Sequence, residues 1–203
     1  IGGDGDLPLD NIFDRIVYGE SLLLTGRSNE VILQSKNILG KTIQHFDTGG
    51  LVETEEYDFN GQPRATTRKL FSKYKELANW TDANLSGNLE VGEFTFTTKT
   101  DALGRITQQT APDGSKITPS YNEAGLLNGE NVLHPGDTLA KVYIKDIDYN
   151  EKGQRNKIIY GNDVTTRFYY DPETFRLNRL ESKRQNGDPL QDWHYTFDPV
   201  GNV

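Results

Sequence analysis

The stretch Tyr149-Asn150-Glu151-Lys152-Gly153 holds the pattern that decides the fold: an aromatic residue or Thr, then Asp or Asn, two variable residues and Gly. The pattern recurs at residues 57–61, 100–104, 121–125 and 197–201, with a degenerate copy at 36–40. A type I turn favours Asp or Asn at its first position and Gly at its fourth. Recurrence of one such turn predicts a chain of consecutive β-hairpins, each forming one repeated unit.

The spacing of these turns supports one repeated unit. Gly40 and Gly61 are 21 residues apart, and so are Gly104 and Gly125. The interval from Gly153 to the turn at 171–174 is about the same, as expected for stacked repeats. The residues that we predict to form the repeat turns are Tyr57, Asp58, Gly61, Asp101, Gly104, Tyr121, Asn122, Gly125, Tyr149, Asn150, Gly153, Tyr170, Asp171, Asp198 and Gly201.

Tighter turns are expected between the repeat turns. Asp113-Gly114, Gly161-Asn162 and Asn186-Gly187 are dipeptides typical of two-residue hairpin loops. Each repeat is therefore predicted to run strand, turn, strand, turn, and the fold class is mainly β.

One segment departs from the β pattern. Leu70, Phe71, Tyr74, Leu77 and Trp80 follow at spacings of one, three, three and three, which predicts an amphipathic helix. We expect this helix, at about residues 66–82, to be an insertion that covers sheet surface. The predicted division is a leading region of loop and strands at 1–35, followed by a repeat region at 36–203.

The leading region is predicted to begin with a loop, because residues 1–11 are rich in Gly and Asp. Asp4-Gly5-Asp6 resembles the start of a calcium loop, but the later ligands are missing, so a solvated loop is favoured over a metal site. Strands are predicted at 12–17, 20–24, 31–33 and 42–46.

Alternation of apolar and polar residues indicates further strands. Phe94 and Phe96 would share one face, and so would Trp193, Tyr195 and Phe197. These two strands are predicted to be half-buried. Residues 141–149 carry apolar side chains on both faces, which favours a central strand.

Composition excludes two classes of partner. The 203 residues carry 30 acidic and 22 basic side chains, a formal net charge of −8, so neither nucleic acid nor an anionic membrane surface is an expected partner. No Cys is present, which excludes disulfides and thiolate metal sites. There is no Met, and the chain begins at Ile1, so we expect an internal fragment of a longer protein.

Catalytic patterns are weak. The three histidines are His45, His134 and His194, and there is neither Cys nor a Gly-x-Ser-x-Gly motif. Asp146 and Asp148 would share a strand face and could act as a carboxylate pair on glycosides, but a solvated face is the simpler interpretation. We predict no enzyme activity, no catalytic or metal-binding residue, and no cofactor.

The turns resemble those of YD-repeat, or Rhs-repeat, proteins. Residues 147–155, the run Tyr160-Gly161-Asn162-Asp163-Val164-Thr165-Thr166-Arg167 and the segments 170–172 and 190–202 are most similar to the B component of bacterial ABC insecticidal toxin (Tc) complexes. The resemblance covers roughly residues 35–203. Thr100 and Lys36 depart from the repeat by replacing its Tyr.

The resemblance implies a β-sheet strip that winds into a hollow spiral shell. In that family the B and C components enclose the toxic C-terminal part of C, which is delivered through a pore-forming A component. The implied partners are the rest of the shell, the C-type component with its effector cargo, and the A component. The implied location is outside the bacterium. No residue here matches the family's self-cleaving aspartyl site, so no catalytic residue is transferred.

Two other function classes remain open at this stage. The first is an extracellular YD-repeat adhesion protein whose exposed sheet binds a partner or a glycan. The tyrosines directly before turn residues weaken this interpretation, because rings in that position pack on neighbouring strands. A β-rich enzyme acting on glycosides is the third and least supported class.

Overall fold

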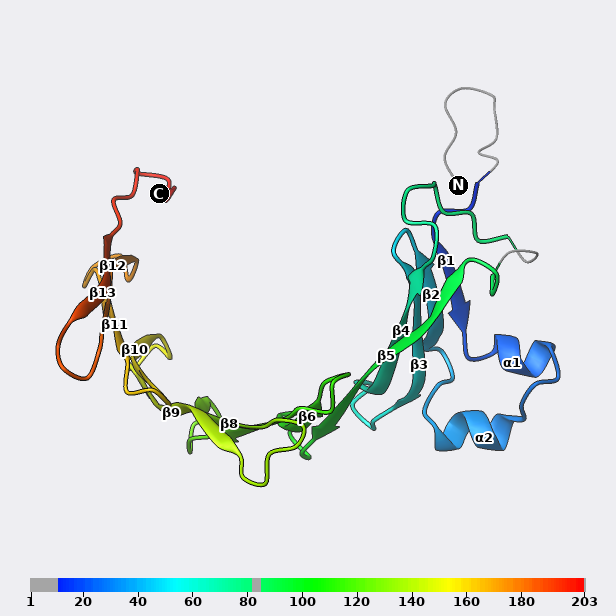
Figure 1. Cartoon of the computed structure of the whole chain (residues 1–203), viewed down its shortest axis with the longest axis horizontal. Coiled ribbons are helices and arrows are strands. Elements are labelled where there is room, and N and C mark those ends of the chain that lie inside the picture. Colours follow the sequence, from blue (N-terminus) through cyan, green and yellow to red (C-terminus); the bar gives the residue numbers. More distant parts are fainter. Residues whose placement is uncertain (1–10, 82–84, 203) are drawn as a thin grey trace. The chain divides into compact units, whose positions relative to one another are not determined.

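A computed structural model describes residues 11–81 and 85–202. The chain divides into two compact units, Ile1–Pro112 and Asp113–Val203, which are described separately below. In each unit the strands are antiparallel and follow one another across the sheet in sequence order (Figure 1). The predicted mainly β fold of consecutive hairpins is therefore confirmed.

The first unit contains a sheet with two short helices. Its elements are β1 (Arg15–Tyr18), α1 (Ser21–Leu24), α2 (Glu30–Ser35), β2 (Thr42–Asp47), β3 (Gly50–Tyr57), β4 (Pro63–Phe71), β5 (Leu89–Thr100) and β6 (Ile106–Thr110). The two helices occupy the connection between β1 and β2 and lie to one side of the strands (Figure 1). Predicted strand 42–46 corresponds to β2, and predicted strand 12–17 corresponds to the shorter β1.

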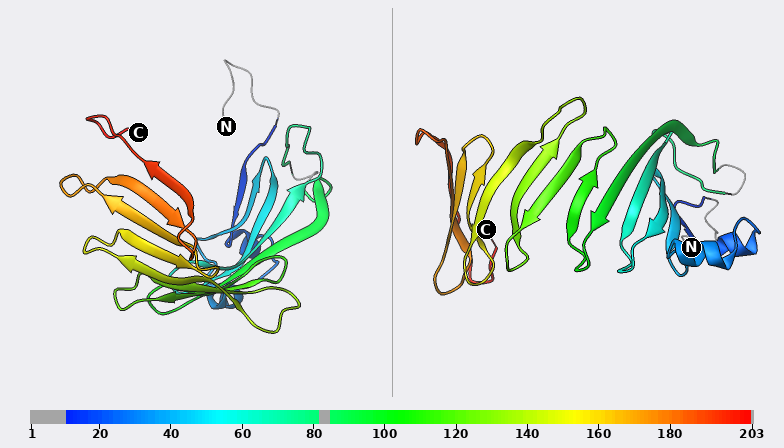
Figure 2. Two further views of the ribbon diagram at one scale, coloured as in Figure 1. Left: turned by 60° about the vertical axis from the view of Figure 1, so that its left-hand side comes forward. Right: turned by 90° about the horizontal axis from the view of Figure 1, so that it is seen from below.

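The second unit is a sheet whose described residues form strands and turns alone. Its strands are β7 (Lys116–Tyr121), β8 (Leu127–Leu133), β9 (Lys141–Tyr149), β10 (Arg155–Tyr160), β11 (Thr165–Tyr170), β12 (Leu177–Lys183) and β13 (Pro189–His194). Figure 2 shows these strands side by side, with hairpin turns at both ends of the strands.

The first unit buries two clusters of apolar side chains. In one, Trp80 is fully buried against Phe46 and Phe71, with both pairs of ring centroids 5.3 Å apart. The indole Nε1 of Trp80 donates a hydrogen bond to the backbone carbonyl of Asp47 at 2.9 Å. The other cluster joins Leu33 of α2 to Ile38 and Ile43.

The second unit has a thinner core. A row of aligned side chains crosses β9 to β12 and comprises Ile147, Ile158, Thr166 and Ser182, all of them buried. The hydroxyl groups of Thr166 and Ser182 are hydrogen-bonded at 2.7 Å. A single sheet layer can bury such a row because adjacent strands place neighbouring side chains about 5 Å apart. The position of Ile147 in the row agrees with the prediction of a central strand at 141–149.

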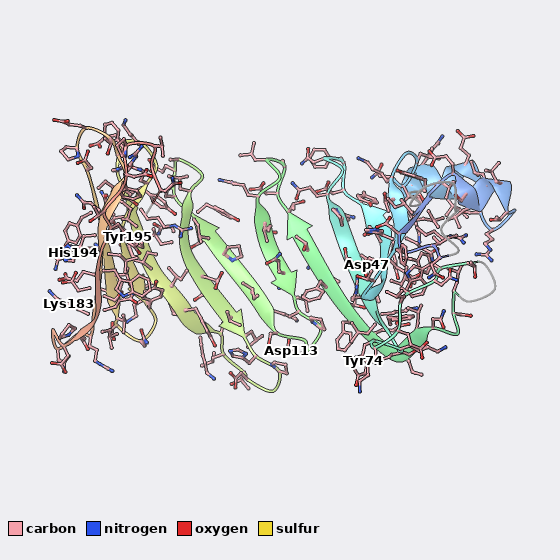
Figure 3. All side chains as sticks on the ribbon, turned by 90° about the horizontal axis from the view of Figure 1, so that it is seen from above. Asp47, Tyr74, Asp113, Lys183, His194 and Tyr195 are labelled. Carbon is pink, nitrogen blue, oxygen red and sulfur yellow. The ribbon has the colours of Figure 1, made fainter. Side chains whose placement is uncertain are left out.

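The predicted helix at about 66–82 is wrong. Residues up to Phe71 belong to β4, which pairs with β3 on one side and β5 on the other, and turns and irregular chain follow up to residue 81. The apolar spacing did not mark one buried face: Trp80 is buried, whereas Tyr74, labelled in Figure 3, and Leu77 are 78% and 75% exposed. A helix this short is marginal alone, so strand pairing decides the conformation.

Two predicted strands in the leading region are also wrong. Residues 21–24 form α1, and residues 30–35 form α2. The side chain of Asn29 caps α2 by accepting a hydrogen bond from the backbone N–H of Ile32 at 3.0 Å. Apolar runs this short do not distinguish a strand from a helix.

The degenerate repeat copy at 36–40 is a helix end rather than a repeat turn. Asn37 adopts a φ of 53°, and the N–H of Ile38 donates to the carbonyl of Leu33 at 3.1 Å. This is the Schellman arrangement that closes a helix, with Asn in the left-handed position. The predicted boundary between residues 35 and 36 stays a prediction, and Asp4-Gly5-Asp6 lies outside the described residues.

The exposed strands differ from the half-buried ones that alternation predicts. Phe94 and Phe96 of β5 are 42% and 52% exposed, and Trp193 of β13 is 57% exposed. Tyr195 follows β13 and is labelled beside His194 in Figure 3. Alternation therefore identified β5 and the start of β13 but overestimated the burial of Phe94, Phe96 and Trp193. The predicted continuation of the strand to Phe197 is wrong, because β13 ends at His194.

The buried tryptophan gives a first prediction. Replacing Trp80 with Ala should lower the free energy of unfolding by about 3–5 kcal/mol, because it empties the centre of the larger cluster. Leu77→Ala in the same segment is the matched control and should change it by less than about 0.5 kcal/mol. Chemical denaturation of both variants checks this prediction, and equal losses would contradict the assignment of the core.

Candidate functional site at the repeat turns

The repeat turns follow the odd-numbered strands. They connect β3 to β4 and β5 to β6 in the first unit, and β7 to β8, β9 to β10 and β11 to β12 in the second. Because neighbouring strands are antiparallel, the turns of one unit all lie at the same end of its strands. We call the turns at this end the turn ladder.

The turn Asp58–Gln62 shows the geometry of one repeat turn. The N–H of Gly61 donates to the carbonyl of Asp58 at 3.0 Å, and the N–H of Asp58 donates to the carbonyl of Gln62 at 2.8 Å. Gly61 has a φ of 80°, which is the left-handed region that favours glycine. The loop therefore has three residues, in a type I turn closed by a left-handed residue.

The side chain of Asp58 fixes this loop from inside. Its Oδ1 accepts hydrogen bonds from the backbone N–H of Asn60 at 2.9 Å and of Gln62 at 2.8 Å. The first residue of the turn thus satisfies two backbone donors that the hairpin ladder leaves free.

The same arrangement recurs along the chain. Oδ1 of Asp101, Asn122, Asn150 and Asp198 accepts from the N–H four residues later, at 2.9–3.0 Å. The glycines of these turns, Gly104, Gly125, Gly153 and Gly201, have φ values of 77°, 76°, 74° and 98°. Tyr121 ends β7 directly before Asn122.

One turn is a residue longer than the others. In Asp171–Arg176, the N–H of Asp171 donates to the carbonyl of Arg176, and the N–H of Phe175 donates to that of Asp171, both at 2.9 Å. Phe175 takes the left-handed position with a φ of 57°. The extra residue explains why the sequence has Asp171 but no glycine three positions later.

Hydroxyl groups join three of the turns to the preceding strand and a fourth to the preceding turn. Tyr149 and Tyr170, the last residues of β9 and β11, donate to the carbonyls of Leu127 and Arg155 at 2.7 and 2.9 Å. Tyr57 donates in the same way to the carbonyl of Thr42. Thr100 occupies the Tyr position of its repeat, and its hydroxyl donates to Oδ2 of Asp58 at 2.7 Å. The predicted Tyr position is thus a hydrogen-bonding position as well as a packing position.

A second connection joins successive turns and was missed by the sequence analysis. Gln62 donates through Nε2 to the carbonyl of Gly104 at 3.4 Å, and Gln154 donates to that of Phe175 at 2.9 Å. Arg176 donates to the carbonyl of Asp198 at 3.3 Å. Each donor directly follows the left-handed residue of its own turn, so a long polar side chain at that position was the available signal.

Hydrogen bonding holds the pKa of the turn carboxylates below the ordinary aspartate value. The largest cause is the Thr100 hydroxyl for Asp58 and the backbone N–H of Arg105 for Asp101. For Asp171 and Asp198 the largest cause is the backbone N–H of Thr174 and of Asn202. Donors stabilise the charged form, which lowers the pKa.

Two of the three turns predicted to have two-residue loops are longer than expected. In 160–164, Asp163 takes the left-handed position with a φ of 66°, and its N–H donates to the carbonyl of Tyr160. Gly187 does the same in 184–188, with a φ of 90°. Gly161 has another role, because a Cβ there would lie 1.7 Å from the carbonyl oxygen of Val142. Gly114 has a φ of 87° beside Asp113.

The residues considered for catalysis lie apart or are engaged otherwise. His45 contacts Asp14 at 2.9 Å, His194 contacts Asp192 at 3.3 Å, and Asp148 forms an ion pair with Lys157. His134 lies between the Tyr143 hydroxyl and Ser115, at 2.7 and 3.4 Å.

The order of the groups around His134 differs from a catalytic triad. Ser115 is buried and donates to Asp113, the residue labelled in Figure 3, so the carboxylate contacts the serine and not the histidine. Within 11–81 and 85–202, no three His, Asp or Glu side chains are placed to hold a metal ion.

Comparison with known proteins identifies chains that are similar to this one. No family model matches the sequence. Toxin subunit YenC2 of Yersinia entomophaga is 32% identical over 178 residues, which are 82% of this chain and 18% of that subunit. Toxin subunit YenC1 of the same organism is 30% identical over 180 residues, 84% of this chain and 18% of the subunit. The chain thus spans less than a fifth of these relatives.

Solved structures agree with the sequence relatives. A crystal structure of TcdB2-TccC3-Cdc42 aligns with a TM-score of 0.80 and 29% identity, over 99% of this chain and 9% of that one. A Photorhabdus luminescens Tc holotoxin pore aligns with a TM-score of 0.81 and 29% identity, over the same shares. This chain is therefore similar, over most of its length, to a section of Rhs-repeat subunits of Tc toxins. The sequence analysis found the B component of Tc complexes most similar, whereas the relatives identified by sequence comparison are the toxin subunits YenC1 and YenC2.

The left-handed glycines give a second prediction. Gly153→Val should lower the free energy of unfolding by about 1–3 kcal/mol, because a β-branched residue is strained at positive φ. A Cβ at Gly153 would meet only Leu126, at 3.9 Å, so the loss measures conformation rather than a clash. Gly104→Val should behave alike. Gly87→Val, where nothing lies within 4 Å, and Asp146→Asn are controls expected to leave the melting temperature unchanged.

The turn carboxylates give a third prediction, on acid stability. Their folded pKa lies below the ordinary value of 3.8, so their stabilisation is present at higher pH and is lost as the pH falls below about 4. Asn keeps the Oδ1 acceptor without titrating, as Asn122 and Asn150 do. A variant with Asn at 58, 101, 171 and 198 should therefore lose less melting temperature between about pH 6 and 2 than the parent chain. Parallel pH curves for the two proteins would contradict this assignment.

Proposed function

We propose that this chain forms part of the wall of a shell that encloses a toxic effector and helps to deliver it. The observation that supports this proposal is the match, over almost the whole chain, between its hairpin sheet and chains from Tc toxin assemblies. The chain covers only a small part of those proteins, so enclosure is a proposal about the longer protein to which these residues belong.

The turn ladder suits a wall. A single sheet layer has little apolar core, so its strands need other connections to remain in order. Tyr149 and Gln154 supply them, one to the preceding strand and one to the next turn, at 2.7 and 2.9 Å. Such a ladder can be extended repeat by repeat without a thicker core.

The proposed partners are the remainder of the shell, a C-type component with its effector cargo, and a pore-forming A component at the level of the complex. We propose that this section has a structural and not an enzymatic role, and that it acts outside the bacterium. Among the described residues, no helix has the length and hydropathy needed to cross a membrane. Nucleic acid is not a proposed partner, in keeping with the net charge of −8.

Protease shielding tests the proposal. The longer protein is expressed with its C-type partner, and the digestion of the partner's C-terminal region is followed over time. We expect this region to be cleaved far more slowly in the complex than when free, because the shell excludes the protease. Digestion at the same rate, with the shell intact, would overturn enclosure and favour an adhesive surface. Unfolding the complex before digestion is the control that restores cleavage.

A further inference from the structure

Four polar side chains are joined by hydrogen bonds at one end of three adjacent strands in the second unit. Asp113 and Ser115 precede β7, His134 directly follows β8, and Tyr143 lies in β9. Antiparallel pairing of β7 with β8 and of β8 with β9 brings these positions together. We call the four side chains the Tyr143 network.

The hydrogen bonds of the Tyr143 network run in one direction. The pKa of the Asp113 carboxyl is lowered, chiefly by the backbone N–H of Ser115, so the group is a charged carboxylate that only accepts. The Ser115 hydroxyl donates its single proton to this carboxylate at 2.8 Å. Towards Nδ1 of His134, which is 3.4 Å away, the same hydroxyl can therefore only accept. Nδ1 thus carries the proton of the neutral imidazole, and Nε2 keeps a lone pair.

This lone pair of His134 faces the hydroxyl of Tyr143. Nε2 and the phenol oxygen are 2.7 Å apart, so the phenol donates its proton to the imidazole. A nucleophile within hydrogen-bond reach of a base, with the base oriented by a third group, is the arrangement that activates a hydroxyl for covalent chemistry. In this network the tyrosine is placed to react, the histidine to take its proton, and Ser115 only to position the histidine.

Tyr143 can be reached from an apolar groove. The residue is 45% exposed and lines a groove of about 800 Å³ together with Val142, Val164 and Leu190. Apolar walls of this kind suit a small apolar group beside a reactive atom, such as the acyl part of an ester.

Ion pairs engage the two amines of the same groove. Lys141 contacts Asp137 at 2.9 Å, and Lys145 forms an ion pair with Asp163. The pKa of Lys141 is raised, chiefly by its hydrogen bond to Asp137. An ammonium group has no lone pair with which to attack, so these pairs favour reaction at Tyr143 over reaction at the lysines.

We propose that Tyr143 is a site of covalent acylation by activated carboxylic esters, with His134 as the general base. The phenol oxygen attacks the carbonyl carbon of the ester, and the bond from that carbon to the leaving phenolate or alkoxide breaks. The phenol proton passes to Nε2 of His134 and then to solvent. This modification is separate from the enclosing role proposed above, since it needs only side chains of the second unit.

Acetylation by p-nitrophenyl acetate tests the proposal. The full chain is treated with this ester, and the acetylated residues are identified and timed by mass spectrometry. Tyr143 should react at least about tenfold faster than Tyr74, because a positioned general base contributes about 100-fold or more in enzymes. Tyr74 is the sharp comparison, because it is more exposed, at 78%, and none of the three histidines is hydrogen-bonded to it among residues 11–81 and 85–202. This comparison needs no variant to fold.

Two variants then separate base assistance from exposure. His134→Gln should slow acetylation of Tyr143 about tenfold and leave that of Tyr74 unchanged. His194→Gln is the matched control, since it makes the same change at an exposed position of the same unit that contacts Asp192, and it should leave both rates unchanged. Faster reaction at Tyr74 than at Tyr143, equal effects of the two variants, or acetylation of the groove lysines in place of Tyr143 would overturn the proposal.

Discussion

This structure depends on one interaction at its turns. A carboxylate or amide oxygen of the first turn residue accepts hydrogen bonds from backbone N–H groups two and four residues later. Each sheet grows by reversing the chain, and every reversal must return the next strand in register. Asn150 shows how this is achieved, because its Oδ1 accepts from Lys152 and Gln154 while Gly153 takes the left-handed position. A short polar side chain and one glycine thus fix the direction and the register of the strand that follows each turn.

The turn alone would not keep neighbouring hairpins in order, and two further positions supply that order. In three repeats the residue before the turn donates to the preceding strand, and in three the residue after the left-handed position donates to the next turn. Tyr149 links the turn at 150–154 to the preceding strand, and Gln154 links it to the next turn. These contacts matter more here than in a two-layered protein, because the second unit buries few apolar side chains.

The sequence predicted features that depend on local backbone conformation. The turn positions could be found because Asp, Asn and Gly are required there by specific hydrogen bonds and φ values. The strand at 42–46 could be found from an apolar run bounded by turn residues, and the strand at 141–149 from apolar side chains on both of its faces.

The failures occurred where a short apolar run fits two conformations. Residues 30–35 form a helix because Asn29 caps it and Asn37 closes it, and neither residue distinguishes a cap from a turn by itself. Phe71 belongs to a strand because β3 and β5 flank β4, information that lies far away in the sequence. The links from Gln62, Gln154 and Arg176 to the next turn were missed, because a long polar side chain after the left-handed residue does not show its partner until successive turns are aligned.

The similarity to Tc toxin subunits and the hydrogen bonding of the turns support the same central claim, which we propose, that this sheet forms part of a shell wall. Cryo-electron microscopy of the longer protein together with its C-type partner tests that claim most directly. The account predicts a closed hollow shell in which the strands β1 to β13 form part of the wall and the repeat turns follow one another along the ends of the strands. A map in which these residues form an isolated open sheet, outside any enclosed volume, would contradict it.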